Sequence, residues 1–351
     1  MREDDAFRAA TMYYLQDETM DVVARRLGVS RSTVSRMIKS ARESGMVRIS
    51  VQEPSHTGVA LSRRLAAAFG VKAHVVPVRE NTTELHRLDQ VAMVAARLIS
   101  EWFTSDMTMG VAWGTTLSAI ARHLVPTRTQ GSAVVQLNGS ANTSARGVAY
   151  GSDLTTTVAG AFNAGVHHFP VPAFFDYAET KKAMWRERSV RRVLDVQRRM
   201  DLALFSVGSL RAHVPSHVYS AGYLTAAELA ELRRRGVAGD VCTVFLREDG
   251  SYRDIDLNER ASGPSPHDLQ TIARRVCVVA GEQKVPALLG ALRARVMTDL
   301  IIDETTGAEL LQYHDSPPAT GNNDRAAAYP QRRGGAARGA KVAPERAGQA
   351  E

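Results

Sequence analysis

The chain has 351 residues, of which 44% are hydrophobic, and carries a formal net charge of +7 at pH 7. This length predicts two domains with a sizeable core, and the basic balance suits a polyanionic partner. The chain has no apolar run long enough to cross a bilayer, and its first residues (MREDDAFR) lack the apolar segment of a secretion signal, so we expect a cytoplasmic protein without a membrane segment.

Residues Met20 to Met46 have the spacing of a helix-turn-helix. Ala24 is small where a second helix crosses the first, Gly28 suits a turn that needs a positive φ, and Val34 is apolar where the second helix packs. Apolar residues complete an inner face at Val22, Val23, Leu27, Val29, Met37 and Ile38.

The opposite face of the second predicted helix is polar and basic. Ser30 is a good N-cap, and between Val22 and Arg42 the chain has six Lys and Arg residues and no Asp or Glu. Hydroxyls and guanidiniums in the first turns of such a helix read base edges in the major groove of DNA. The candidate DNA-contacting residues are Ser30, Arg31, Ser32, Thr33, Ser35, Arg36 and Lys39. The alternative is an ordinary helical hairpin with a solvated basic face.

The segments on either side of this motif extend it into a domain. Residues Ala6 to Leu15 have apolar side chains at helical spacing, which predicts a scaffold helix. After Gly45, residues Met46 to Val51 alternate apolar and polar, which predicts a short strand and therefore a winged variant. Arg48 on this wing would lie near the DNA backbone.

Between residues 55 and 314, short β-rich runs alternate with amphipathic helices. The predicted strands are Ala73–Val78, Met107–Ala112, Ser132–Leu137, Val166–Pro170, Leu202–Val207, Val241–Leu246, Val276–Ala280 and Leu300–Ile302. Helices between them include Leu85–Phe103, Thr116–Leu124, Leu154–Ala164, Ala226–Arg235, Pro266–Arg274 and Val285–Arg295. This alternation predicts βαβ crossovers and an α/β domain with a mainly parallel sheet, and ligands of such sheets bind beyond the carboxyl ends of the strands.

The predicted strand Met107–Ala112 leads into a candidate anion site. Gly114 lets a ligand approach the backbone, and Thr115 and Thr116 open a helix whose free N–H groups face that ligand. A phosphate or another anionic group would fit there. The alternative is that Thr115 merely caps the helix.

Four further strand ends add polar groups to the same edge of the sheet. Asn138 and Gly139 end one strand and Gly208 ends another, while Asp240, placed before the strand that begins at Val241, offers a carboxylate for sugar hydroxyls. Lys284 opens a helix, where a cation opposes the helix dipole and can instead bind a phosphate. Each of these segments could also be a simple turn.

The remaining chemistry-bearing residues form no pattern of a metal or redox site. Cys242 and Cys277 lie in apolar runs and are predicted to be buried strand thiols, and no Cys or His cluster has ligand spacing, so no metal or cofactor is expected. Residues 315–351 contain many Gly, Ala and Pro and almost no large apolar side chains, which predicts a disordered tail.

With these residues in view, the chain resembles the SorC-type sugar-binding transcriptional regulators, over about Phe7 to Gln312. The matching motifs in the head are Tyr13–Leu15, Val23–Arg31, Val34–Arg36 and Ala41–Val47. In the second domain they are Trp113–Leu117, Asn138–Gly139, Val207–Ser209, Val237–Asp240, Lys284–Ala287 and Asp299–Glu304. The chain departs from the family at Phe245–Asp249 and Asn142–Asp153.

The resemblance implies a DNA-binding head joined to an effector domain similar to sugar-phosphate isomerases. It implies a phosphorylated sugar or polyol as effector, and a homo-oligomer, usually a tetramer, on a palindromic operator of double-stranded DNA. Carried over by position, Gly114, Thr115, Thr116 and Lys284 would hold the effector phosphate, and Asp240 would meet its hydroxyls.

The sequence therefore predicts a winged helix-turn-helix domain at 1–54, an effector-binding and oligomerisation domain at 55–314 and a tail at 315–351. Such a chain would be a regulator with no catalytic residues. Two alternatives remain open: a sugar-phosphate isomerase or deaminase with Asp240 or Glu282 as general base, and an architectural DNA binder without a ligand. The size of the second domain argues against the architectural binder, since dimerisation needs far less.

Overall fold

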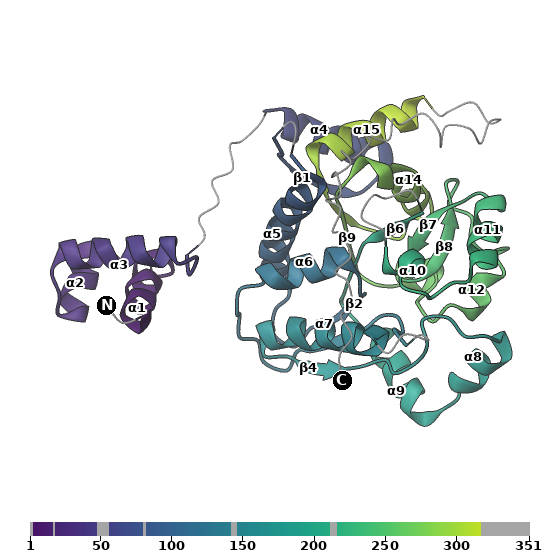
Figure 1. The fold of residues 1–351 in the computed structure, drawn as a ribbon, viewed down its shortest axis with the longest axis horizontal. Helices are drawn as coiled ribbons and strands as arrows, with labels where there is room; N and C mark the ends of the chain where they lie inside the picture. Colours follow the sequence, from purple (N-terminus) through teal and green to yellow (C-terminus); the bar gives the residue numbers. More distant parts are fainter. Residues whose placement is uncertain are drawn as a thin grey trace, which may run out of the picture.

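The computed structural model describes residues 3–16, 18–47, 56–79, 82–141, 146–210 and 216–316. Figure 1 shows the order of the helices and strands within these ranges. The predictions for Arg48, for the strand residues from 48 to 51 and for the tail from residue 317 concern residues outside the described part of the chain. Met46 and Val47, the first residues of the predicted strand, form a bend, and residue 315 of the predicted tail still belongs to the last helix, so these two bounds were wrong.

Three helices form the N-terminal head, as expected. They are α1 (Glu3–Tyr14), α2 (Met20–Leu27) and α3 (Arg31–Glu43). Gly28 ends α2 with a left-handed φ of 67°, and its N–H donates to the carbonyl of Ala24. Ser30 caps α3 by accepting a hydrogen bond from the Thr33 amide. The predicted turn and cap are therefore confirmed.

The head is held together by a small apolar core on the inner faces of its helices. Val23 and Val34 are fully buried, and Met37 and Ile38 are nearly so. Ala9 from α1 completes the cluster, because small residues let the three helices approach closely. The apolar face predicted from helical spacing is thus the face that packs, which leaves the polar face of α3 to the solvent.

The second domain is built on a seven-stranded parallel sheet in the order β1-β10-β9-β5-β2-β3-β4. Its strands are β1 (Lys72–Val76), β2 (Thr108–Val111), β3 (Ala133–Gln136), β4 (Gly165–His167), β5 (Leu202–Phe205), β9 (Arg274–Val279) and β10 (Asp299–Asp303). The prediction of a mainly parallel sheet is confirmed.

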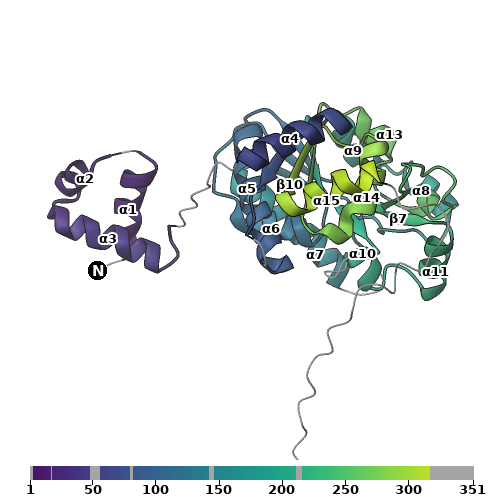
Figure 2. The same ribbon diagram turned by 90° about the horizontal axis from the view of Figure 1, so that it is seen from above.

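Helices cover both faces of this sheet and bury one apolar cluster on each. One face carries α4 (His56–Phe69), α9 (Arg188–Gln197), α14 (Val285–Arg293) and α15 (Glu304–Asp315). Figure 2 shows α4, α15 and α14 lying together on it. The other face carries α5 (Glu84–Trp102), α6 (Thr115–His123) and α7 (Arg146–Phe162).

The order of the strands changes direction between β2 and β5. The chain adds β3 and β4 on one side of β2, and then adds β5, β9 and β10 on the other side. The connections that leave the carboxyl ends of β2 and β5 therefore diverge, which opens a crevice at this point of a parallel sheet.

A small antiparallel sheet corrects the prediction of one strand over Val241–Leu246. It consists of β6 (Val207–Ser209), β7 (Val237–Val241) and β8 (Val244–Arg247). Cys242 and Thr243 form a two-residue turn between β7 and β8 with φ of 49° and 71°. A turn of this type normally carries Asn or Gly, so its apolar sequence looked like continuous strand. Cys242 is accordingly a buried turn residue, and Asp240 lies within β7.

Several helices of the second domain were not assigned from the sequence. They are α4 and α9 together with α8 (Ala178–Met184), α10 (His217–Ser220) and α12 (Leu257–Arg260). Others differ in extent from the prediction, since α7 begins eight residues earlier and α13 (Pro266–Gln270) is shorter. The strands and helices around the crevice, by contrast, match within two residues at α5, α6, α11 (Ala226–Arg234), α14 and β2.

A buried carboxylate ties three segments together at the carboxyl end of the sheet. Asp303 is fully buried and accepts hydrogen bonds from Arg87 Nη1 of α5 at 2.8 Å and from the Gly281 amide at 3.2 Å. It also caps α15 through the amide and hydroxyl of Thr306, at 3.0 and 2.6 Å. These bonds fix the loop after β9, which carries Lys284.

We expect Asp303→Ala to destabilise the second domain by about 3 to 5 kcal/mol, because it leaves the buried Arg87 guanidinium with only its longer pair to the exposed Glu282 and removes the acceptor of the Gly281 and Thr306 amides. Urea unfolding followed by circular dichroism measures the change. Asp195→Ala is the control, since it removes an exposed carboxylate paired with Arg198 and should cost less than about 1 kcal/mol. Equal losses in the two variants would contradict the role given to Asp303.

Candidate functional site

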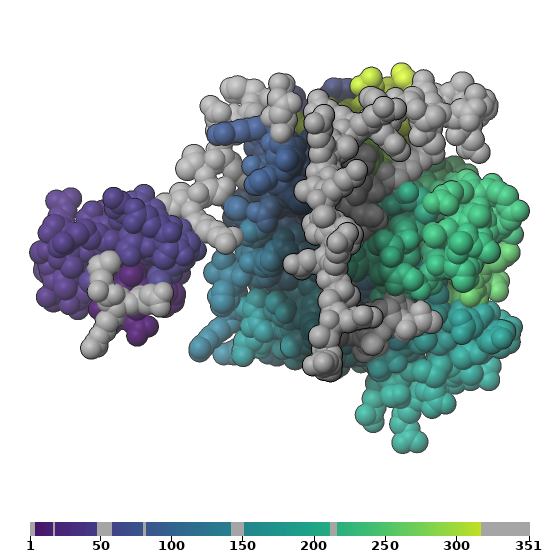
Figure 3. Space-filling view, in the orientation of Figure 1, coloured from purple at the N-terminus to yellow at the C-terminus, as the bar shows by residue number. Residues whose placement is uncertain are grey.

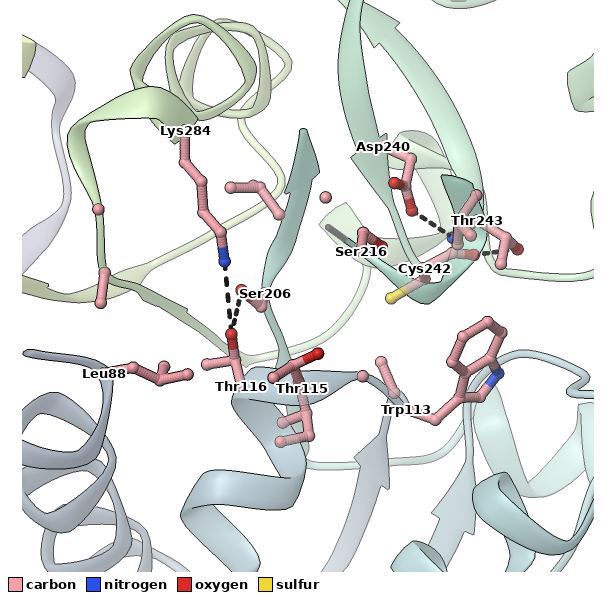
Figure 4. Close-up of a pocket in the computed structure, with 18 of the residues that line it drawn as sticks. Leu88, Trp113, Thr115, Thr116, Ser206, Ser216, Asp240, Cys242, Thr243 and Lys284 are labelled. Carbon is pink, nitrogen blue, oxygen red and sulfur yellow. Dashed lines mark hydrogen bonds between the residues drawn. The ribbon is translucent and has the colours of Figure 1, made fainter. Parts of the chain in front are cut away.

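A pocket occupies the crevice between β2 and β5. It contains about 820 Å³ of space between atoms, a volume that includes its open mouth. Figure 4 shows its walls: the start of α6 on one side, the β7–β8 turn on another and Lys284 reaching in from above. The residues that line it come from α5, α6, β6, α10, β7 and the loop after β9, so distant parts of the chain converge here.

One wall presents hydrogen-bond donors and positive charge. Gly114 occupies the N-cap of α6 and makes no side-chain cap, so the first amides of the helix face the pocket. Lys284 Nζ lies 3.5 Å from the Thr116 hydroxyl, which also accepts from Ser206 at 3.3 Å. Thr115 lines the same wall and begins the helix without capping it. An anionic group fits this arrangement.

Lys284 carries its charge in an environment poor in water. It lies in the short 3₁₀ turn Glu282–Lys284 and precedes α14, with part of its surface exposed toward the pocket that it lines. Burial lowers the pKa of Lys284, while the neighbouring Cys277, Asp240 and Glu84 act to raise it. A buried ammonium without a close carboxylate gains most from an anion in the pocket.

The opposite wall presents acceptor oxygens that lack partners within the described residues. Asp240 and Asn138 are almost fully buried, and Oδ1 of each has no hydrogen-bond donor. Oε1 of Gln283, which also lines the pocket, is unpaired as well. Buried acceptors without donors are costly, so this wall suits a ligand with several hydroxyl groups.

Asp240 is the most strongly perturbed of these groups. Burial raises the pKa of Asp240 to about 6. The Tyr219 hydroxyl, the Thr243 amide and Lys284 act in the opposite direction and lower this pKa. The Thr243 amide donates to Oδ2 at 3.1 Å. Tyr219 lies close enough to shift this pKa, yet its hydroxyl and Asp240 Oδ1 form no hydrogen bond of good geometry. The carboxyl is thus poised to change protonation when a ligand binds.

Gly208 contributes to the pocket by making room for this carboxyl. It pairs with Asp240 across β6 and β7, and a Cβ at position 208 would overlap Asp240 Oδ1. Any other residue at position 208 would therefore displace the carboxylate. Gly208 also lines the pocket, as the sequence analysis expected of a ligand-contacting residue.

Gly139 lies outside the pocket wall, unlike its neighbour Asn138. A Cβ at position 139 would overlap the carbonyls of Val171 and Pro172, so glycine permits a close approach of two backbone segments. Its carbonyl accepts a hydrogen bond from Trp113 Nε1 at 2.9 Å. The position expected to contact a ligand thus orients the indole that lines the pocket.

Several pocket residues were not singled out from the sequence. Trp113 stacks on Tyr223 with ring centroids 5.1 Å apart and forms part of the wall. Ser206 and Thr243 come from the ends of β5 and β7, and no local signal distinguished either of them from an ordinary turn residue. Glu282, the second candidate general base, does not line the pocket and instead pairs with Arg87 at 3.5 Å.

The head presents the predicted polar face of α3 to solvent. Arg31, Arg36 and Lys39 are exposed, as are the small polar residues Ser30, Ser32 and Ser35, while Thr33 is half-buried. Arg36 donates to the Thr33 hydroxyl at 3.3 Å, which positions its guanidinium along the helix. Arg31 and Lys39 make only long, exposed ion pairs with Asp21 and Glu43, both 3.7 Å, which bound DNA can replace.

Within the described residues, no cluster of three His, Cys, Asp or Glu side chains could hold a metal ion. Over the same ranges, every helix is too short or too polar to span a lipid bilayer.

Comparison with known proteins reveals extensive similarity. Residues 54–312 match the family model described as "Putative sugar-binding domain". The deoxyribonucleoside regulator of Bacillus subtilis is 32% identical over 87% of this chain and 96% of its own length. The sorbitol operon regulator of Klebsiella pneumoniae is 27% identical over 87% and 96%.

Solved structures agree with these sequence matches. The full-length sorbitol operon regulator SorC from Klebsiella pneumoniae has a TM-score of 0.71 at 25% identity, and covers 87% of this chain and 97% of that one. A domain of a possible sugar-binding transcriptional regulator from Arthrobacter aurescens is 48% identical with a TM-score of 0.69, over 74% of this chain and all of that one.

We expect Asp240→Asn to stabilise the domain at pH 7. The folded-state pKa of Asp240, about 6, lies above the value near 3.9 of an unfolded chain. The folded protein therefore keeps a proton that the unfolded chain has released, and its free energy of unfolding falls as the pH rises from about 4 to about 6. The variant escapes this loss, which is about 3 kcal/mol for two pKa units.

Urea unfolding of both proteins between pH 4 and pH 8 measures this effect. The stability difference should grow in favour of Asp240→Asn up to about pH 6 and then stay constant. Asp256→Asn, which changes an exposed carboxylate, is the control. A difference that does not vary with pH over this range would show that the carboxyl of Asp240 has an ordinary pKa.

Proposed function

Because the chain belongs to the SorC-type sugar-binding transcriptional regulators, we propose that a phosphorylated sugar or polyol in the pocket between β2 and β5 controls its binding to an operator. One observation supports a phosphorylated effector: a cationic wall rich in hydrogen-bond donors faces a wall rich in acceptors across a single pocket. A molecule with a phosphate at one end and hydroxyls at the other satisfies both.

In this proposal, the phosphate binds at the start of α6. The amides after Gly114, the hydroxyls of Thr115 and Thr116 and the ammonium of Lys284 supply its hydrogen bonds and countercharge. The lowered pKa of Lys284 supports this role, because a dianion beside it would restore the charged form.

The hydroxyl groups of the effector meet Asp240 and Asn138, whose unpaired oxygens can each accept a hydrogen bond. Relatives named for deoxyribonucleosides and for the sorbitol operon agree with a sugar or polyol skeleton. A site built to pair with hydroxyls rejects analogues that lack them, since the acceptors are then buried unpaired.

We assign DNA recognition to residues 1–54, with Arg31, Ser32, Thr33, Ser35, Arg36 and Lys39 of α3 facing the major groove and Arg48 near the backbone. Ser30 serves by capping α3. Residues 55–314 would bind the effector and form a dimer or tetramer, because paired heads are needed to read a palindromic operator.

Coupling between the pocket and the head follows a continuous set of contacts. The loop that carries Lys284 is fixed to Asp303 and Thr306 at the start of α15, and α15 packs against α4, the first helix after the head. An effector that favours one position of this loop would shift the position of α4 and so the spacing of paired heads. Such a shift requires different affinities for the two states.

This proposal treats the domain as a sensor and assigns no turnover to it. Of the two candidate general bases, Glu282 pairs with Arg87 outside the pocket, and Asp240 is assigned to the effector hydroxyls. Incubation with candidate sugar phosphates and analysis of products tests this directly, and turnover at enzymatic rates would reject the sensor assignment.

We expect Arg36→Ala to weaken operator binding by about 1 to 3 kcal/mol and to relax sequence preference, since a bidentate contact to a base edge is lost. Fluorescence anisotropy with operator and random duplexes measures both affinities. Arg97→Ala on α5, an exposed arginine outside the head, is the control with the same change of charge. An equal loss on operator and random DNA would mean that Arg36 contacts only phosphates.

We expect Thr115→Ala combined with Lys284→Met to abolish the response to the effector while operator affinity stays near the wild-type value. The pair removes a hydroxyl and the charge of the phosphate wall and keeps most of its volume. A thermal-shift screen of phosphorylated sugars and polyols first identifies the effector, because binding to the folded state raises the midpoint. Titration of the protein–operator complex then measures release.

Lys182→Met, which removes an exposed ammonium from α8, is the control and should respond like the wild type. If the double variant still releases the operator at wild-type effector concentrations, the phosphate does not bind at the start of α6.

A further inference from the structure

The segment formed by α8 and α9 is strongly basic. Residues 178–200 contain eight Lys and Arg side chains against three Asp and Glu, a net charge of +5 where the whole chain has +7. Figures 1 and 3 show this segment at the lower right edge of the second domain. It has no part in the effector pocket, so the pocket does not explain its charge.

The arginines of α9 gather on its solvent face. Val190 and Val193 are buried against the sheet, while Arg188, Arg191 and Arg192 are exposed on the other side. Together with Arg186 and Asp195 they surround a shallow depression. Among the described residues, no carboxylate forms an ion pair with Arg186, Arg188, Arg191 or Arg192.

This arrangement is unfavourable for the helix alone. Like charges at spacings of three and four residues repel each other, and Arg188 and Arg191 lie in the first turn, where the helix dipole also disfavours cations. The one carboxylate at this helix start is the N-cap Glu187, which forms no ion pair with these arginines. A polyanion laid along this face would remove the repulsion.

The position of α9 within the domain suits DNA. It packs on the same face of the sheet as α4, the first helix after the head. α4 contacts β1 and α9 contacts β3, so five strand spacings, about 24 Å, separate them. This is less than one turn of DNA, about 34 Å. A duplex that runs past α4 can therefore also reach α9 within about one turn.

We propose that the arginine face of α9 binds phosphates of the DNA that flanks the operator sequence read by the head. Arginine suits this contact because its planar fork bonds two phosphate oxygens and stays charged. From Arg188 to Arg192 the helix rises about 6 Å, so these three side chains can face neighbouring phosphates of one strand. The inference rests on the DNA binding of the proposed function, but adds a second surface that carries no sequence information.

The test compares full-length variants on a long duplex with flanking DNA and on a short duplex trimmed to the operator. The variant is Arg188→Gln, Arg191→Gln, Arg192→Gln. Each phosphate contact contributes about 0.9 to the slope of log affinity against log salt, so this variant should lower the slope by about 2 to 3 on the long duplex. On the short duplex it should bind like the wild type.

The control is Arg97→Gln, Arg122→Gln, Arg128→Gln, which removes the same charge from exposed residues of α5, α6 and the segment after α6. It should keep the wild-type slope on both duplexes. An equal reduction in both triple variants would show a general effect of net charge and overturn the proposal. So would an unchanged slope in the α9 variant, or a loss that is the same on the short duplex.

The same measurements separate this inference from the proposed function. A wild-type chain that binds neither duplex at moderate salt would overturn both. If the wild type binds and releases the operator with effector while the α9 variant keeps its slope, only the flanking contact is rejected.

Discussion

The reversal of strand order between β2 and β5 determines where the pocket of the second domain lies. Because the strands are parallel, their carboxyl ends all lie at one edge of the sheet. The connections that follow β2 and β5 run to opposite sides, and this leaves a crevice between them at that edge. The start of α6, the end of β5 and the loop after β9 therefore surround the same space. The positions of Thr116 and Lys284, 168 residues apart, follow from this topology.

The elements around the pocket could be read from the sequence to different extents. The turn at Gly28 and the cap at Ser30 are local signals, since a positive φ and a side-chain acceptor each favour particular residues. The glycine and threonines after β2 likewise predicted a helix start facing a ligand, and they do line the pocket. Rules of this kind need only a few neighbouring residues.

Features set by distant contacts could not be predicted in the same way. Cys242 and Thr243 adopt positive φ because surrounding segments impose it: the Asp240 carboxylate accepts the Thr243 amide, and a Cβ at Gly263 would overlap the Cys242 carbonyl. Tyr219 approaches Asp240 from α10, a helix that the apolar periodicity of the sequence did not predict. Gly139 looked like a ligand contact, but its role is to allow a close backbone approach.

Several unfavourable features of the domain lie where a ligand would relieve them. A carboxyl with a raised pKa, a lysine with a lowered pKa and unpaired oxygens of Asn138 and Gln283 all line one pocket, next to a strained turn. The apolar clusters on both faces of the sheet stabilise the backbone independently of the pocket, so the domain stays folded despite this cost. A site that stores strain and unpaired polar groups binds a matching ligand with more free energy than a relaxed site does. That differential affinity is what a regulator needs in order to shift between two states.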